Sequence, residues 1–231
     1  LLPGDIMGSF IYDSRADSFR FRRGPIFTNL ILADEINRGT PKTQSALLEA
    51  MQEQQVTVEG QSFALDKPFM VIATQNPLEF EGTYPLPEAQ IDRFLARMSM
   101  GYPSPEAECD MLARRQARQA DAVTLSPVLS KQDFLKIQRA IEAIHVNPDI
   151  HSYIVQIVAK TRADSRVQLG ASPRGSLALF KLSRSRAMMQ GRDFVTPDDV
   201  KAVAVPALAH RVLLRPELWA ERISGETVVQ D

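Results

Sequence analysis

The fold of this chain is decided by nine consecutive residues, Leu30-Ile31-Leu32-Ala33-Asp34-Glu35-Ile36-Asn37-Arg38. An apolar run that ends in two adjacent carboxylates and a polar turn is typical of a buried strand in a parallel sheet. Open α/β sheets bind their ligands at the carboxyl ends of the strands. We therefore expect Asp34 and Glu35 to lie in a crevice at that edge of the sheet.

A second apolar strand is predicted at residues 69–74, and it is followed by Gln75 and Asn76. The amide of Asn76 would then lie at the same edge as the two carboxylates. Nucleoside-triphosphatases use such groups to bind Mg²⁺ and to orient the attacking water. The same pattern also marks ordinary strand ends, and an asparagine before Pro77 is a common turn residue.

The composition is that of an ordinary globular protein. Of 231 residues, 44% are hydrophobic and 24% are charged, which suits one large domain or two small ones. The formal charge of -1 gives no reason to expect nucleic acid or an anionic membrane as a partner. The single cysteine, Cys109, excludes an internal disulfide. No apolar run approaches the roughly 20 residues of a membrane span, and no signal peptide opens the chain, so we expect a cytoplasmic protein.

The chain divides into two regions that differ in predicted secondary structure, and we predict domains at residues 1–120 and 121–231. Short strands, turns and brief helices dominate up to about residue 103, and this predicts an α/β layer. No convincing strand follows, and the remainder predicts helices, over residues 104–119, 130–144, 149–163 and 172–191 and from residue 196. In the first region we further expect a strand at 19–22, a helix after the N-cap Thr40, a hairpin at 55–65 and a helix at 87–98.

Three segments of the chain resemble the MoxR family of AAA+ ATPases. They are GPIFTNLILADEINRGTPKTQSALLEAMQEQQVTVEG (24–60), VIATQNPLEFEGTYPLPEAQIDRFLARMSMGYPS (71–104) and ASPRGSLAL (171–179). The resemblance covers nearly the whole chain and places it in the helix-2-insert clade. It implies an α/β fold: a truncated αβα AAA+ core with a parallel sheet, followed by an all-helical lid domain.

The resemblance also implies roles for the polar residues at the predicted sheet edge. Asp34 and Glu35 correspond to the Walker B motif, in which Asp34 binds Mg²⁺, usually through water, and Glu35 is the catalytic base. Asn76 corresponds to sensor 1. The implied cofactors are ATP and Mg²⁺.

Two arginines complete the site that the resemblance implies. Arg93, in the sequence Asp-Arg-Phe, corresponds to the arginine finger that reaches the ATP of a neighbouring subunit, and Arg97, one turn later, is the alternative. Arg174 corresponds to sensor 2 in the lid. The residues alone also allow Arg93 to pair with Asp92 or Glu88 on the surface, and Arg174 to be a solvated residue at a helix start.

One departure from the family pattern is large. No Gly-x-x-x-x-Gly-Lys-Ser/Thr sequence, which would cradle the phosphates, occurs in the 231 residues. We expect this Walker A segment to lie upstream of residue 1, so that the chain is an incomplete core. The fragment alone is then expected to be inactive.

The resemblance implies an ATPase that assembles as a homo-oligomeric ring, a hexamer, and remodels or matures partner proteins, often ones with von Willebrand factor A domains. Residues 2–23 and 55–65 resemble elements that face the pore or the partner in such rings. Two other functions stay open: a scaffold that hydrolyses no ATP, and an AAA+ motor that acts on nucleic acid, against which the near-neutral charge weighs.

Overall fold

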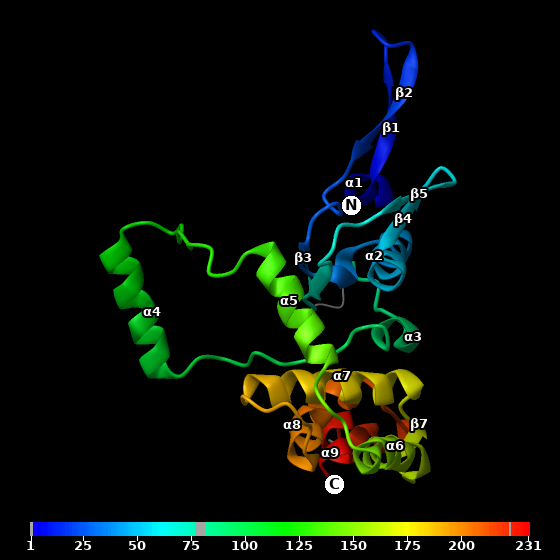
Figure 1. Cartoon of the computed structure of the whole chain (residues 1–231), viewed down its shortest axis with the longest axis vertical. Helices are drawn as coiled ribbons and strands as arrows, with labels where there is room; N and C mark the ends of the chain where they lie inside the picture. The colour runs from blue at the N-terminus through cyan, green and yellow to red at the C-terminus, as the bar shows by residue number, and fades with distance from the viewer. Residues whose placement is uncertain (1, 77–81, 222) are drawn as a thin grey trace.

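The chain folds into an α/β half and a helical half, which Figure 1 shows one above the other. The computed structural model describes residues 2–76, 82–221 and 223–231. In the first half, strands β3 (Leu30–Ala33) and β6 (Met70–Ala73) pair in parallel. The predicted parallel sheet with its adjacent helix is therefore confirmed.

The chain between β3 and β6 forms the helix and the hairpin that the sequence predicts. It holds the short 3-10 helix η1 (Ile36–Arg38), the helix α2 (Pro41–Glu53), and the antiparallel strands β4 (Gln55–Val58) and β5 (Gln61–Ala64). The side chain of Thr40 caps α2, as expected from a threonine that precedes a proline. Such signals are local, which is why these elements are readable from the sequence.

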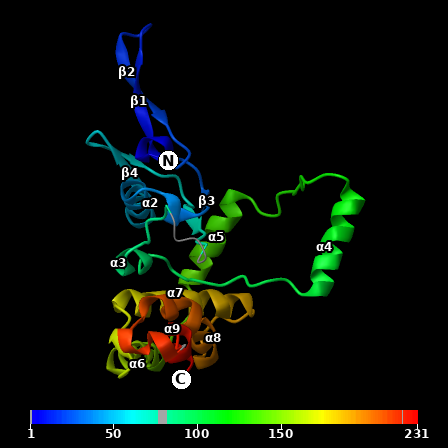
Figure 2. The same ribbon diagram turned by 180° about the vertical axis from the view of Figure 1, so that it is seen from behind.

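A longer hairpin precedes the sheet, where the sequence predicts only one strand. After the helix α1 (Pro3–Met7), strands β1 (Gly8–Asp13) and β2 (Ser18–Arg23) pair in antiparallel register. The hairpin projects from the end of the α/β half in both views of the molecule (Figures 1 and 2). Its base is anchored because the ring of Phe21 stacks on that of Phe63, with 4.1 Å between the centroids.

Strand β3 is shorter and less buried than its apolar sequence predicts. The side chains of Leu30 and Leu32 are 57% and 67% exposed, whereas Ile31 and Ala33 pack against the core of this half. Side chains alternate between the faces of a strand, so Leu30 and Leu32 share the face that stays largely exposed. The expectation that this apolar run forms a buried strand is therefore wrong for one face of β3.

The second half is helical, as predicted. The long helices are α4 (Pro105–Arg118), α5 (Lys131–Glu142), α6 (Pro148–Ala163), α7 (Pro173–Met189) and α8 (Pro197–Leu208). Three of its helices, α6 to α8, supply most of an apolar core that includes Ile154, Val158, Leu179 and Leu208. A polar residue precedes each long helix and caps its first turn, which is the signal that locates these helices in the sequence.

This half also contains a short pair of strands that the sequence does not reveal. Strand β7 (Val167–Leu169) pairs in antiparallel register with β8 (Leu213–Leu214). Runs of two or three residues are too short to show a strand period, so the prediction of purely helical structure is wrong here. The remaining elements are η2 (Ala209–Arg211), η3 (Pro216–Glu221) and α9 (Gly225–Gln230).

The helix predicted at residues 87–98 is reduced to a single turn, α3 (Glu88–Ile91). The backbone carbonyls of Asp92, Phe94 and Leu95 accept hydrogen bonds from the guanidinium of Arg211. The segment that follows α3 is thus bonded to a side chain from the second half, and no local pattern in the sequence reveals such a contact.

Helix α4 and the segments on either side of it extend away from the rest of the molecule in both views (Figures 1 and 2), and none of its residues is buried. The domain boundary at residues 120/121, which falls just after α4, stays a prediction. Among the described helices, none combines the length and the apolar character that a membrane crossing requires.

Candidate functional site

The two carboxylate residues after β3 are tied to the end of β6 by one side chain. The hydroxyl of Thr74 donates a hydrogen bond to Asp34 Oδ1 at 2.5 Å and accepts one from the backbone N–H of Glu35 at 2.9 Å. The parallel pairing supports this contact, since the backbone N–H of Thr74 donates to the carbonyl of Ala33 at 3.0 Å. The carboxylate of Asp34 stays exposed to solvent, so that it can reach a bound cation.

The backbone of Glu35 adopts an unusual conformation. Its φ of 51° lies in the left-handed region, which is rare for a residue other than glycine and is found often at functional sites. Its carboxylate forms an ion pair with Arg38, with 3.0 Å between Oε2 and Nε, and both side chains are partly exposed. The turn therefore directs the Glu35 side chain away from β3 and toward η1.

A buried glutamine on α2 forms hydrogen bonds that hold the turn after Glu35 in place. The side chain of Gln44 is 2% exposed, and its amide nitrogen donates to the carbonyls of Ile36, at 3.2 Å, and Tyr84, at 2.8 Å. The backbone N–H of Tyr84 in turn donates to the carbonyl of Asn37 at 2.6 Å. These bonds connect η1 to α2 and to the segment at Tyr84, and they restrict the positions that η1 can adopt.

Asn76 follows Thr74 by two residues and is half-buried. Since β3 and β6 are parallel and adjacent, their carboxyl ends share one edge of the sheet. The structure therefore brings Asp34, Glu35 and Asn76 to the same edge, as the sequence predicts.

A second polar cluster joins the two halves of the molecule around Asp92. Its carboxylate accepts hydrogen bonds from Ser172 Oγ at 3.0 Å, from Arg211 Nε at 2.9 Å and from Arg174 Nη1 at 3.4 Å. The Asp92 side chain is 18% exposed. Arg174, which the sequence assigns to a nucleotide sensor, is thus paired with an aspartate of the α/β half. Among the described residues, no bond joins Arg174 to Asp34 or Glu35.

Arg211 is the buried member of this cluster, with a side chain that is 3% exposed. Burial lowers the pKa of Arg211, and the Asp92 carboxylate opposes that shift. Burial and then the charge of Arg211 lower the pKa of the neighbouring His210 to about 4. His210 is therefore neutral near pH 7, and the cluster contains one buried positive charge, on Arg211.

The candidate arginine finger lies beside this cluster. Arg93 follows Asp92 directly and is half-buried, and its Nε atom is buried with no hydrogen-bond partner among the described residues. The alternative, Arg97, has an exposed side chain, and its backbone N–H donates to the carbonyl of Pro206 at 2.9 Å. The choice between the two residues stays a prediction.

Sequence reasoning missed three residues of these clusters. Thr74 reads as the last residue of a strand, although a polar residue at a strand's carboxyl end is itself a signal. Asp92 appears only as a surface partner of Arg93, and Arg211 does not appear at all. Bonds between residues 82 or 119 positions apart leave no local pattern that would reveal them.

The residues at the sheet edge suit Mg²⁺ better than a metal held by protein ligands alone. In the part of the chain that the structure describes, no three His, Cys, Asp or Glu side chains form a metal-binding group. Mg²⁺ commonly uses one or two carboxylates and completes its coordination with water and substrate phosphates. The exposed carboxylate of Asp34 fits that requirement.

Comparison with known proteins identifies the family. Residues 1–96 match the family model of the ATPase family associated with various cellular activities (AAA), and residues 159–231 match the AAA lid domain. The chain is 51% identical to the uncharacterized protein YeaC of Bacillus subtilis over 231 residues, which are 100% of this chain and 72% of YeaC. It is 43% identical to the chaperone MoxR1 of Mycobacterium tuberculosis over 238 residues, covering 99% of this chain and 62% of MoxR1.

A solved structure agrees with these relatives. The crystal structure of a protein from Cytophaga hutchinsonii, described as a candidate ATPase, superposes with a TM-score of 0.91 at 40% identity and covers 100% of this chain and 72% of that one. The chain spans less than two thirds of the length of MoxR1 and somewhat more of the other two. Together, the shared core, the shared lid and these identities show that the chain belongs to the MoxR family of AAA+ ATPases.

Proposed function

We propose that the edge formed by Asp34, Glu35 and Asn76 is the hydrolytic half of an ATP site. The observation that carries this proposal is the hydroxyl of Thr74, which fixes the side chain of Asp34 and the backbone of Glu35 at the ends of two parallel strands. Phosphoryl transfer needs a metal ligand and a water-positioning group at fixed places, and a rigid edge supplies both.

Each residue of the edge has a distinct role in this proposal. Asp34 would hold Mg²⁺, Glu35 accepts the proton of the attacking water, and Asn76 orients that water or the γ-phosphate. When bound, Mg²⁺ neutralises the charge of the phosphate oxygens. The ion pair between Glu35 and Arg38 must open before Glu35 can act as a base, and its exposure makes opening inexpensive.

Two arginines supply positive charge to the phosphates in this proposal. Arg174 approaches the nucleotide from the lid, and Arg93, or alternatively Arg97, reaches the nucleotide of a neighbouring subunit. Activity would then require a ring of identical chains, for which we propose a hexamer. The partly unsatisfied guanidinium of Arg93 supports a role at such an interface, because a buried nitrogen without a partner is unfavourable in the isolated chain.

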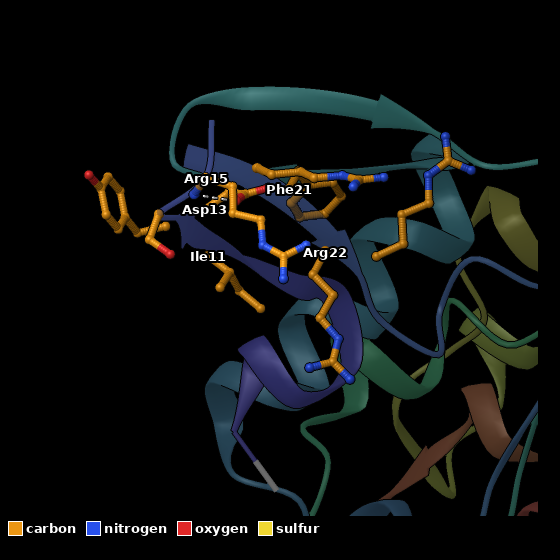
Figure 3. A pocket seen from close by; sticks show the side chains of 9 residues that line it. Ile11, Asp13, Arg15, Phe21 and Arg22 are labelled. Carbon is orange, nitrogen blue, oxygen red and sulfur yellow. Dashed lines mark hydrogen bonds between the residues drawn. The ribbon is translucent and has the colours of Figure 1, made fainter. Parts of the chain in front are cut away.

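We further propose that the cycle remodels or matures a partner protein in the cytoplasm, in line with a relative that is named a chaperone. A partner with a von Willebrand factor A domain is the specific form of this proposal. The surface of this chain that contacts the partner would include the β1–β2 hairpin, which projects from the core. A shallow hollow there is lined by Ile11, Arg15, Arg20 and Arg22, and Figure 3 shows the side chains around it.

The arginines of the hairpin are available for such a contact. The register pairs Ile11 with Arg20, and Arg22 lies two residues further along the same face. In the described part of the chain, Arg15, Arg20 and Arg22 form no ion pair. Nucleic acid is the less favoured partner because the chain as a whole carries a formal charge of only -1.

The test is Mg-ATP binding by this chain and, alongside it, by the protein extended upstream of residue 1. We expect binding by the extended protein and none by the chain alone, because the phosphate cradle is not among the 231 residues. Tight binding by the chain alone would contradict the assignment of the cradle to an upstream segment. Binding by neither protein would overturn the ATPase proposal and favour a scaffold.

A further inference from the structure

Two arginines of the helical half share the carboxylate of Asp92, but their environments differ. The side chain of Arg211 is 3% exposed, and its guanidinium bonds to Asp92 Oδ1 as well as to the carbonyls of Asp92 and Phe94. The side chain of Arg174 is 46% exposed, and its 3.4 Å contact with Asp92 Oδ2 is the one side-chain bond that it makes among the described residues. One partner of Asp92 is enclosed and the other is open to solvent.

This difference decides which contact can be exchanged. An exposed ion pair is worth little in water, whereas removal of one member of a buried pair leaves an uncompensated charge in the interior. Arg174 can therefore leave Asp92 at low cost, and Arg211 cannot. After Arg174 has left, the bonds from Arg211 and Ser172 still connect Asp92 to the helical half.

At its position, Arg174 could also pair with a phosphate, which is negatively charged like the carboxylate of Asp92. Arg174 lies in the first turn of α7, where the backbone N–H groups and the helix dipole also favour an anion. A phosphate oxygen near this turn would compete directly with the Asp92 carboxylate for the guanidinium. Because phosphate accepts two parallel bonds from an arginine, it can replace a single long bond.

We propose that Asp92 is a positioning residue that holds Arg174 at the junction of the two halves. A nucleotide phosphate then replaces the Asp92 carboxylate as the partner of Arg174. The proposal rests on the proposed ATPase function, since it assigns a resting partner to the lid arginine of that same site. Binding of the nucleotide then breaks one contact between the halves and keeps the others. The residue next to Asp92 is Arg93, so this exchange changes the charge beside the candidate finger.

The proposal predicts that Asp92 opposes nucleotide binding. In the full-length protein, including whatever sequence precedes residue 1, Asp92→Asn should tighten the Kd for Mg-ATP by about two- to fivefold, the range expected for loss of an exposed ion pair. The matched control is Glu88→Gln, which removes the same charge from the exposed surface of α3 and leaves Arg174 paired. It should leave the Kd unchanged.

A double-mutant cycle separates this role from a structural one. In an Arg174→Ala background, Asp92→Asn should no longer change the Kd, because the arginine for which carboxylate and phosphate compete is absent. A structural effect of Asp92→Asn would instead persist in both backgrounds. Asp92→Asn could fail to fold because Arg211 has lost its counter-charge. In that case the variant Asp92→Asn/Arg211→Met, which removes both members of the buried pair, is used in place of Asp92→Asn in the same cycle.

The outcomes are distinguishable. Tighter binding that disappears with Arg174→Ala supports the proposal. Unchanged or weaker Mg-ATP binding by Asp92→Asn, or the same tightening in both backgrounds, overturns the proposal for Asp92. The proposed ATPase function is not affected by that result as long as the parent protein binds Mg-ATP. No Mg-ATP binding by the full-length parent overturns both.

Discussion

The hydroxyl of Thr74 donates a 2.5 Å hydrogen bond to the carboxylate of Asp34, across the parallel strands β6 and β3. The same oxygen accepts the backbone N–H of Glu35. A single hydroxyl therefore positions both residues to which the ATPase chemistry is assigned. Neither residue can shift along the sheet edge without losing a bond to the neighbouring strand.

Replacement of this hydroxyl should impair hydrolysis. Thr74→Val keeps the shape of the side chain but leaves Asp34 without its donor and the Glu35 N–H without its acceptor. Loss of a group that orients a metal ligand typically costs about 10- to 100-fold in metal affinity or activity. We expect ATPase activity of the full-length protein to need a correspondingly higher Mg²⁺ concentration or to fall by that factor. Thr74→Ser keeps the hydroxyl and should stay close to the parent; equal Mg²⁺ titrations for the valine and serine variants would contradict this role.

The finger assignment is tested by mixing subunits. Full-length Arg93→Ala should be inactive alone, because each site would lack the positive charge from its neighbour, and it should regain turnover in mixed rings with Glu35→Gln subunits. ATPase assays on the pure variants and on the mixture measure this. Arg97→Ala is the control and should retain activity. Normal turnover by pure Arg93→Ala would exclude Arg93, and loss of turnover in Arg97→Ala alone would assign the finger to Arg97.

The two arginines on Asp92 should differ in their effect on folding. Arg211→Ala leaves the half-enclosed carboxylate of Asp92 and several carbonyls without their donor, and it should lower the free energy of unfolding by about 3–5 kcal/mol. Arg174→Ala removes an exposed pair and should cost less than about 1 kcal/mol. Urea unfolding of both variants checks this. Similar losses for the two would show that the contacts of Arg211 are not a permanent connection.

Asp199 should contribute to a loss of stability of the helical half in acid. Two hydrogen bonds from Arg192, at 2.6 and 2.7 Å, lower the pKa of Asp199 to about 2, against 3.8 for a free aspartate. Because the folded pKa is the lower one, the stabilisation is complete above about pH 4 and disappears as the pH falls toward 2. The shift corresponds to at most about 2 kcal/mol, and to about 1 once solvent screening at Arg192 is included.

Unfolding of Asp199→Asn and of the parent between pH 5 and pH 2 measures this contribution. The variant should be less stable at pH 5, and the difference should shrink toward pH 2. The neighbouring Asp198 is exposed, so Asp198→Asn is the matched control and should show a smaller difference at both ends. A stability difference for Asp199→Asn that is constant over this range would mean that the carboxylate's charge is not what stabilises the helix start.

The sequence predicts the features of this fold that depend on neighbouring residues. Helices α2 and α5 follow from Thr40 and Ser130, whose side chains cap the first turn, and from the apolar positions behind them. The site carboxylates Asp34 and Glu35 follow from the apolar run that they end. In each case the signal and the structure lie within a few residues of one another.

The features that escape prediction depend on distant residues. Helix α3 ends at Ile91, and the carbonyls of Asp92 and Phe94 just beyond it accept hydrogen bonds from Arg211, about 120 positions later. One face of β3, with Leu30 and Leu32, is exposed. The apolar side chains of these residues do not reveal whether another element packs against that face. The pairing of Asp92 with Arg174 joins two halves of the chain and has no local signature.

The most direct test of the central claim is the comparison of Glu35→Gln with the parent in the full-length protein, measuring Mg-ATP binding and ATP turnover in the same preparation. Glutamine keeps the size of the side chain but cannot accept the proton of the attacking water, and general-base catalysis typically contributes about 10²- to 10⁴-fold. The account predicts an unchanged Kd for Mg-ATP and loss of most turnover. Equal turnover in the variant and the parent would remove Glu35 from the role of base and contradict the assignment of this sheet edge as the hydrolytic site.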